Sequence, residues 1–130
     1  SMDRQVIRTD RAPAAVGPYK QAIAATGQTL FVAGQIALNP QTGNLIETDD
    51  IARQTEQIMA NIAAILSEAG ADWSNVVKTT IFLTDMNNFA AVNAVYGNYF
   101  DPQEAPARSC VEVSRLPKNA IVEIECIATI

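Results

Sequence analysis

The feature that most constrains the fold is a change of hydrophobic period near residue 50. From Ile51 to Ala69, apolar residues recur every three or four positions, as on one face of a helix. Asp50 and the residues just before it are suited to cap that helix, and Gly70 is suited to end it. The pattern predicts a helix over about 50–69.

The segments before this helix favour strands separated by turns. Residues 10–18 contain Pro13, Gly17 and Pro18 and are typical of a loop, while 39–43 is a strong turn signal. Gly27-Gln28 favours a tight hairpin. The strands expected here are 4–8 at an edge, then 20–26 and 29–36 as the two arms of that hairpin.

A second strand–helix unit and a second hairpin are expected after the helix. The elements are a buried strand at 76–84, a helix at about 87–100 capped by Asp85 or Asn87, and a hairpin of 108–114 with 121–129. The order is β-β-β-α-β-α-β-β. It predicts an α+β sandwich in which one mostly antiparallel sheet carries both helices on one face.

Length and composition indicate one globular domain over residues 1–130. Apolar residues make up 48% of the chain and charged residues 18%, which suits an ordinary core without metal or disulfide support. No apolar run reaches 18 residues, so no membrane partner is expected. Ser1-Met2 is interpreted as a tag residue followed by the natural start, with no secretory leader.

Two absences narrow the chemistry. There is no histidine, which excludes Ser-His-Asp triads, Cys-His pairs and histidine-ligated metals. The two cysteines, Cys110 and Cys126, cannot alone hold a structural zinc and favour a reduced, cytoplasmic protein. No metal is expected. A net charge of −5 argues against a nucleic-acid partner.

Two helices cannot cover both faces of a six-stranded sheet. Strand 29–36 is apolar on both of its alternations, with Leu30 and Val32 on one and Phe31 and Ala33 on the other. We therefore expect a closed homo-oligomer whose subunits meet sheet to sheet.

The candidate chemistry lies on the terminal hairpin. Alternation places Arg108, Cys110, Glu112 and Ser114 on one face of their strand, and we expect that face, with Glu123 and Glu125, to point away from the core. A solvated outer face is the alternative. The Arg108 guanidinium would clamp a carboxylate with two hydrogen bonds.

Four further residues are candidates for the wall of a pocket. Asn93 lies on the apolar stripe of the second helix and must find hydrogen-bond partners, as a ligand contact or as a structural amide. Tyr19 follows Gly17-Pro18 on a stiff loop, where simple packing is the alternative. Gly34 lies inside a strand and indicates a close approach. Cys110 is interpreted as a passive wall of the pocket; the alternative is a nucleophile, whose activation would depend on Arg108 because there is no histidine.

Several segments, in order along nearly the whole chain, resemble the RidA family (YjgF/UK114, also called L-PSP). They are 12–19 (APAAVGPY), 32–36 (VAGQI), 106–113 (PARSCVEV), 116–118 (LPK) and 122–125 (VEIE). The stretch from Pro106 to Glu125 is the most specific and is similar to the deaminase-competent subgroup. Ala105 and the short 101–105 loop depart from the family pattern and affect pocket size and substrate range.

The resemblance implies a chorismate-mutase-like fold and a homotrimer with sites between subunits. It implies hydrolysis of 2-imino acids and their enamines, such as 2-iminobutanoate and 2-iminopropanoate, to 2-keto acids and ammonia. Pyridoxal-phosphate dehydratases would supply them, and no cofactor is implied for this chain. Arg108 matches the carboxylate clamp and Glu123 the acid that handles water. The pocket wall is matched by Tyr19, Gly34, Asn93 and Cys110.

The expected register separates the two catalytic candidates. A hairpin tip at 117–118 sets Arg108 opposite Ile127 and Glu123 opposite Glu112, roughly 13 Å apart along the sheet. We therefore expect Arg108 of one subunit to meet Glu123 of its neighbour. The alternatives are an endoribonuclease or translation inhibitor, and a non-catalytic trimer that binds small carboxylates.

Overall fold

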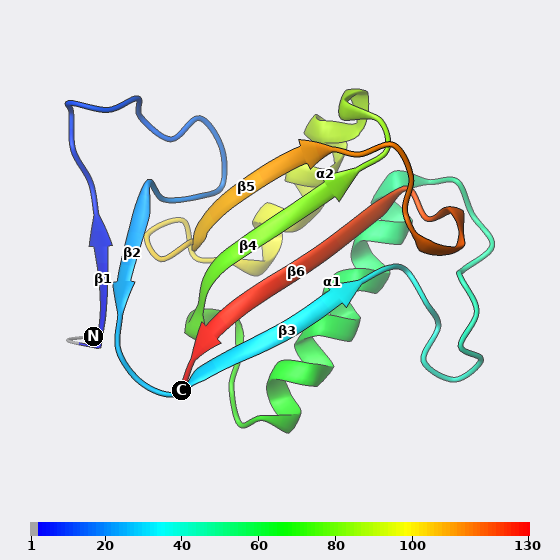
Figure 1. Ribbon diagram of the computed structural model, residues 1–130, viewed down its shortest axis with the longest axis horizontal. Helices are drawn as coiled ribbons and strands as arrows, with labels where there is room; N and C mark the ends of the chain where they lie inside the picture. Colours follow the sequence, from blue (N-terminus) through cyan, green and yellow to red (C-terminus); the bar gives the residue numbers. More distant parts are fainter. Residues whose placement is uncertain (1–2) are drawn as a thin grey trace.

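The computed structural model describes residues 3–130, so the interpretation of Ser1-Met2 lies outside the described residues (Figure 1). The elements are β1 (Arg4–Ile7), β2 (Ala22–Ala25), β3 (Thr29–Gln35), α1 (Ile51–Glu68), β4 (Val76–Leu83), α2 (Phe89–Tyr96), β5 (Ala107–Glu112) and β6 (Val122–Thr129). The element order and the α+β class are confirmed. The second helix is shorter than expected because 3-10 turns at 86–88 and 97–99 flank it.

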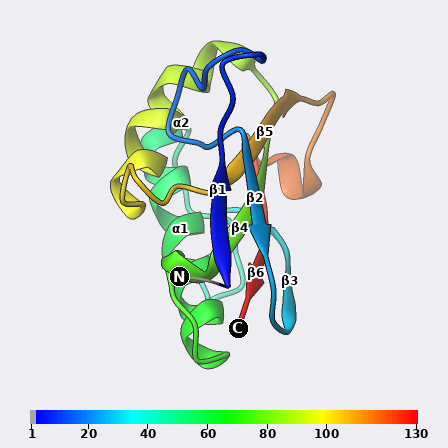
Figure 2. The same cartoon turned by 90° about the vertical axis from the view of Figure 1, so that its left-hand side faces the viewer.

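Both helices cover the same face of the sheet, as expected (Figures 1 and 2). Ile58 and Ile62 of α1 and Val92 of α2 are buried against Ile81 of β4 and Ile124 of β6. The N-cap of α1 is Asp50, whose carboxylate accepts from two backbone amides of the first turn. The two helices and the facing side of the sheet therefore enclose one core.

The strands form a four-stranded sheet in the order β3-β6-β4-β5 and a two-stranded ribbon of β1 and β2. The ribbon is joined to the edge strand β5 by a bridge between Lys20 and Ala107. The β4–β5 pairing is parallel, whereas the other three pairings in the described chain are antiparallel.

The hairpin expected around Gly27-Gln28 is wrong. β2 pairs with β1, and β3 pairs with β6. Gln28 and Ile130 exchange two backbone hydrogen bonds, of 2.8 and 2.9 Å. The connection is therefore paired with the end of the chain instead of closing a hairpin on itself.

The predicted terminal hairpin, of 108–114 with 121–129, is also wrong. β5 pairs with β4, and β6 lies on the other side of β4. The segment 116–120 crosses over, with Leu116 and Ala120 buried against Ile36. β4 takes the central position because half of its side chains are buried in the core and it needs partners on both edges. The parallel β4–α2–β5 unit follows from that position.

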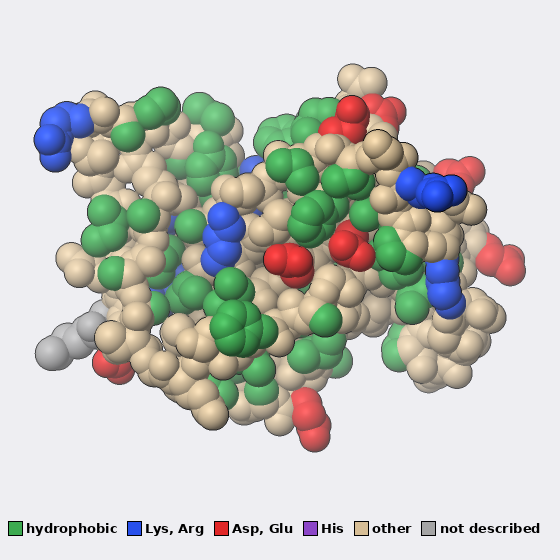
Figure 3. Space-filling view, viewed as in Figure 1, with side chains coloured by type: hydrophobic (Ala, Val, Ile, Leu, Met, Phe, Trp, Pro, Cys, Tyr) green, Lys and Arg blue, Asp and Glu red, His purple; other side chains and the backbone are tan. Residues whose placement is uncertain are grey.

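The face of the sheet opposite the helices is open within one chain (Figure 3). By register it carries Phe31, Lys78, Val111, Glu123 and Glu125. Phe31 is 75% exposed and Val111 41%. Cover by a second subunit stays a prediction. Within residues 3–130, no helix has the length and apolar character needed to span a bilayer.

Candidate active site

Arg108 is held in an aromatic setting on the helix side of β5. Its guanidinium carbon lies 5.3 Å from the ring centre of Tyr19, 5.4 Å from that of Phe89 and 5.2 Å from that of Tyr96. Its Nη1 donates to Asn93 Oδ1 at 2.6 Å. No carboxylate within residues 3–130 pairs with it. A half-buried cation with neutral neighbours and spare donors is suited to bind an anion.

The prediction that the Arg108 face of β5 points away from the core is wrong. Arg108 and Cys110 point toward α2 and the core, and Glu112 accepts a hydrogen bond from Met86 N at 2.8 Å. Ser114 lies beyond the end of β5. Alternation groups the side chains of a strand correctly, but it does not say which group is inside. On this edge strand the polar group lines the margin of the helix layer.

Tyr19 and Asn93 are both brought to Arg108, as expected. The Asn93 amide oxygen finds its partner in the guanidinium. The Tyr19 hydroxyl accepts from Val16 N at 3.3 Å, which fixes the ring against its own loop. A Cβ added at Gly17 would lie 3.4 Å from Arg108 Nη2, so the loop backbone passes close to the guanidinium.

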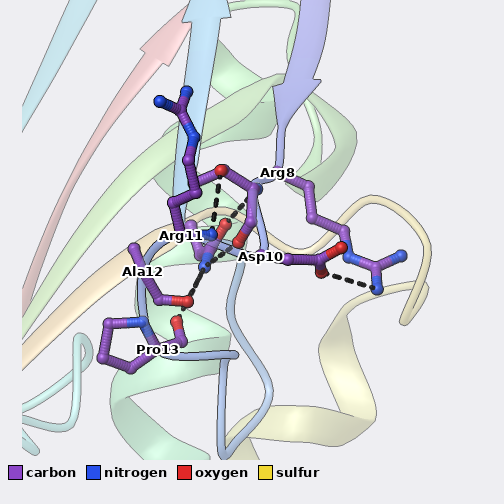
Figure 4. Close-up of polar contacts among 7 residues, drawn as sticks. Arg8, Asp10, Arg11, Ala12 and Pro13 are labelled. Carbon is purple, nitrogen blue, oxygen red and sulfur yellow. Dashed lines mark hydrogen bonds and ion pairs between the residues drawn. The ribbon is translucent and has the colours of Figure 1, made fainter.

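The loop that carries Tyr19 is fastened by Gln21, a residue that the sequence analysis missed. Figure 4 shows part of this loop, with Arg11, Ala12 and Pro13. Gln21 Oε1 accepts from Thr9 N at 2.8 Å, and its Nε2 donates to the carbonyls of Thr9 and Pro13 at 3.1 and 2.7 Å. Loop carbonyls need donors, but no pattern marks a lone glutamine as their source. The ion pair between Arg8 and Asp10 is not part of this set of Gln21 hydrogen bonds (Figure 4).

The floor of the site, formed by Tyr96 and Thr79, is a second feature that the sequence analysis missed. Tyr96 is fully buried, and its hydroxyl and the Thr79 hydroxyl form a buried hydrogen bond of 2.8 Å. Thr79 is also the register partner of Arg108. Burial raises the pKa of Tyr96 to about 12, so the phenol stays protonated. The only signal in the sequence was that Phe89 and Tyr96 share a helix face with Asn93.

Cys110 follows Arg108 by two residues on the same side of β5. Burial raises the pKa of its thiol, and the nearby Arg108 charge offsets only part of that effect. A thiol that is protonated at neutral pH is a poor nucleophile. This placement agrees with a wall residue.

Glu123 lies elsewhere, on the open face of β6, as expected. Burial, followed by the charge of Glu125, raises the pKa of its carboxyl. A Cβ added at Gly34 would lie 2.9 Å from the Glu123 carboxyl carbon. Gly34 is therefore a neighbour of Glu123 and makes room for its carboxylate.

One chain does not bring Arg108 and Glu123 together. Arg108 pairs with Thr79 and Glu123 with Phe82, which are three residues apart on β4. Neighbours that differ by an odd number along a strand face opposite sides of the sheet. The two side chains are therefore apart within one chain, as expected, but because they face opposite sides of the sheet. The calculated separation of roughly 13 Å along one face is wrong, because the hairpin from which it was derived does not exist.

Residues 9–130 match the family model described as Endoribonuclease L-PSP. A RutC family protein of Synechocystis is 59% identical over 99% of this chain and 98% of its own length. The chloroplastic Reactive Intermediate Deaminase A of Arabidopsis thaliana is 48% identical over 100% of this chain and 68% of its own.

Solved structures agree with these sequence relatives. A Yersinia pestis protein of the conserved Rid family has 52% identity and a TM-score of 0.76, covering 98% of this chain and 99% of its own. RidA from an Antarctic Psychrobacter has 43% identity and a TM-score of 0.75, covering 97% and 99%. The chain therefore belongs to the endoribonuclease L-PSP family, also called the RidA family, which includes a reactive intermediate deaminase.

Proposed function

We propose that this protein hydrolyses 2-imino acids, such as 2-iminobutanoate and 2-iminopropanoate, to 2-keto acids and ammonia. The observation that carries the proposal is Arg108, a half-buried guanidinium with an amide and three aromatic rings around it and no carboxylate partner within residues 3–130. Its spare donors match the carboxylate that every 2-imino acid carries. The name of the Arabidopsis relative, Reactive Intermediate Deaminase A, supports the reaction class.

We propose that Glu123 is the acid–base group that accepts a proton from the attacking water. Its raised pKa brings a carboxyl closer to the range in which it both takes and gives a proton. Water adds to the carbon of the protonated imine, and Glu123 takes the proton that the water loses. The same proton then moves to the amino group of the carbinolamine. As the carbon–nitrogen bond breaks and ammonia leaves, the carbinolamine oxygen re-forms the carbonyl and gives its proton to the Glu123 carboxylate, so that the 2-keto acid remains and the proton passes on to the ammonia.

The proposed active unit is a homotrimer in which Arg108 of one subunit faces Glu123 of the next. The support is the opposite facing of the two side chains across the sheet and the exposure of Phe31 on the open face. A positioned acid–base group accelerates a reaction by about 10²–10⁴-fold, and alignment of the substrate on a charged clamp accelerates it further.

The two free thiols suit a reducing cytoplasm, which is the proposed location.

The test is the decay of an imine generated in situ from threonine by a threonine dehydratase. We expect the wild-type protein to accelerate the loss of 2-iminobutanoate, Arg108→Ala to abolish the acceleration, and Glu123→Gln to reduce it about 10²–10⁴-fold. Arg115→Ala, at an exposed arginine, is the matched control and should behave like wild type. If wild type gives no acceleration but binds 2-ketobutyrate through Arg108, the protein is a carboxylate-binding module and not a deaminase.

A further inference from the structure

The Gln21 side chain pairs with the backbone at the start of the loop 10–18. Its Oε1 accepts from Thr9 N at 2.8 Å, and its Nε2 donates to Thr9 O at 3.1 Å. The same Nε2 donates to the carbonyls of Pro13 at 2.7 Å and Ala12 at 3.5 Å. The amide therefore uses its acceptor and both of its donors on the chain around the loop, as a neighbouring strand would.

The backbone next to Gln21 is attached to the strand that carries Arg108. Lys20 N donates to Pro106 O at 3.1 Å, and Lys20 forms a parallel bridge with Ala107. Gln21 is half-buried beside this attachment. Its hydrogen bonds therefore hold the start of the loop in a fixed position relative to β5.

The end of the loop lies against the guanidinium. The Tyr19 ring centre is 5.3 Å from Arg108 Cζ, and a Cβ added at Gly17 would lie 3.4 Å from Arg108 Nη2. Residues 10–17 are all exposed, and Val16 is 88% exposed. A segment with so little buried surface opens easily unless hydrogen bonds hold it. The position of Tyr19 on Arg108 therefore depends on the hydrogen bonds that fasten the loop.

We propose that Gln21 is a positioning residue for the Arg108 site: its amide holds the loop 10–18 closed and so keeps Tyr19 on the guanidinium. A guanidinium that is already held in place loses less conformational freedom when a carboxylate binds. Gln21 thereby raises the affinity of the site for a carboxylate through the loop. The inference goes beyond the proposed function, and only its consequence for hydrolysis rests on that function.

Two substitutions separate the hydrogen bonds of Gln21 from its bulk. Gln21→Met keeps an unbranched side chain of similar length and removes the amide. Gln21→Glu keeps an acceptor for Thr9 N, but its carboxylate has no donor for the Pro13 carbonyl. Gln5→Met is the matched control, because Gln5 is an exposed glutamine of β1 in the same two-stranded ribbon.

The experiment measures the affinity for 2-ketobutyrate by calorimetry and the decay of 2-iminobutanoate by kinetics. We expect Gln21→Met and Gln21→Glu to weaken the affinity by about tenfold. KM should rise by about the same factor, and kcat should change by less than about threefold, because Glu123 lies on the other face of the sheet. Gln5→Met should match wild type.

A double-mutant cycle tests whether Gln21 acts through Tyr19. In a Tyr19→Leu background, Gln21→Met should change the affinity by less than about twofold, because the ring that it positions is absent. Full additivity of the two substitutions, or an unchanged affinity in folded Gln21→Met, would show a merely structural role and overturn the inference. If Gln21→Met does not fold, Gln21→Glu is used for the same comparisons.

Failure of the proposed function gives a different result from failure of this inference. If wild type neither hydrolyses the imine nor binds 2-ketobutyrate, the proposed function fails, and amide hydrogen exchange decides the role of Gln21. The reporter is Val16 N, which donates to the Tyr19 hydroxyl at 3.3 Å. Faster exchange at Val16 in Gln21→Met or Gln21→Glu, and not in Gln5→Met, supports the inference. Unchanged exchange overturns it.

Discussion

The surroundings of Arg108 and those of Glu123 are built in opposite ways. Arg108 lies among side chains of its own chain, with an amide on one nitrogen and three rings around it. Glu123 lies on an open sheet face beside another carboxylate, with exposed Phe31 on the same face. The clamp is therefore complete in one chain, and the acid is not. Under the proposed function, this difference means that hydrolysis requires assembly of subunits, whereas binding of the carboxylate does not.

The sharpest test of this comparison is to mix two variants, each of which lacks one of the two groups. Arg108→Ala keeps Glu123, and Glu123→Gln keeps Arg108. If each site takes one residue from each of two subunits, random mixed trimers contain intact sites at about one half times one half, or about a quarter, of the interfaces. Imine hydrolysis should then rise from background to about a quarter of the wild-type rate, measured after joint refolding.

Each variant refolded by itself is the control for that mixing. Native mass spectrometry of the mixture must show that the two variants share oligomers. Mixed oligomers without recovered activity would mean that Arg108 and Glu123 act within one subunit, through a rearrangement of the sheet edge.

Two glycine substitutions test the surroundings of Glu123 and of Arg108 separately, and we expect smaller changes in activity than in the mixing experiment. In Gly34→Ala the new Cβ meets the Glu123 carboxyl carbon at 2.9 Å, and because that is the far end of a flexible side chain, the carboxylate moves and the fold stays. We expect kcat to fall by about 10–100-fold because a small displacement of a reacting group costs that much. The affinity for 2-ketobutyrate, measured by calorimetry, should not change.

Gly17→Ala is the matched variant on the other side. Its Cβ would lie 3.3 Å from the Tyr19 ring and 3.4 Å from Arg108 Nη2, so it crowds the clamp. Here 2-ketobutyrate affinity should fall. Equal effects of both substitutions on affinity would argue against two separately built regions.

The sequence predicted the elements far better than their partners. The helix at Ile51–Glu68 and the core side of β6 follow from local period and capping, which act over a few residues. Both predicted hairpins are wrong because pairing depends on which strand can be central, and β4 takes that position between β5 and β6. A tight turn favours a hairpin locally, but it cannot exclude a crossover.

The candidate site shows the same division. Tyr19, Asn93 and Arg108 do come together, and Gly34 does approach another group, as its place inside a strand indicated. Gln21, Phe89 and Tyr96 were missed because their roles depend on which loop and helix β5 lies against. That information is tertiary, and no local pattern contains it.

A third prediction concerns the floor beneath Arg108. Tyr96→Phe keeps the ring under the guanidinium and leaves the buried Thr79 hydroxyl without this partner. We expect a loss of about 1–2 kcal/mol in the free energy of unfolding, measured with urea, because an unmade buried hydrogen bond costs that much. The affinity for 2-ketobutyrate should stay near wild type. A large loss of affinity would show that the hydroxyl, and not the ring, positions Arg108.

The smallest expected effect is on the pH profile of hydrolysis. Glu125 is a like charge beside Glu123 and helps to raise its pKa, after burial. Lys78 is the charged group that β4 contributes to this face, and β3 contributes none within the described residues. Removing a negative charge eases ionisation of Glu123. Glu125→Gln should therefore lower the pKa of Glu123, and the limb of the kcat profile that needs its carboxylate should move to lower pH.

Glu56→Gln, at an exposed position of α1, is the control and should leave the profile unchanged. An unchanged profile in Glu125→Gln, or a shift to higher pH, would contradict the role given to the Glu125 charge.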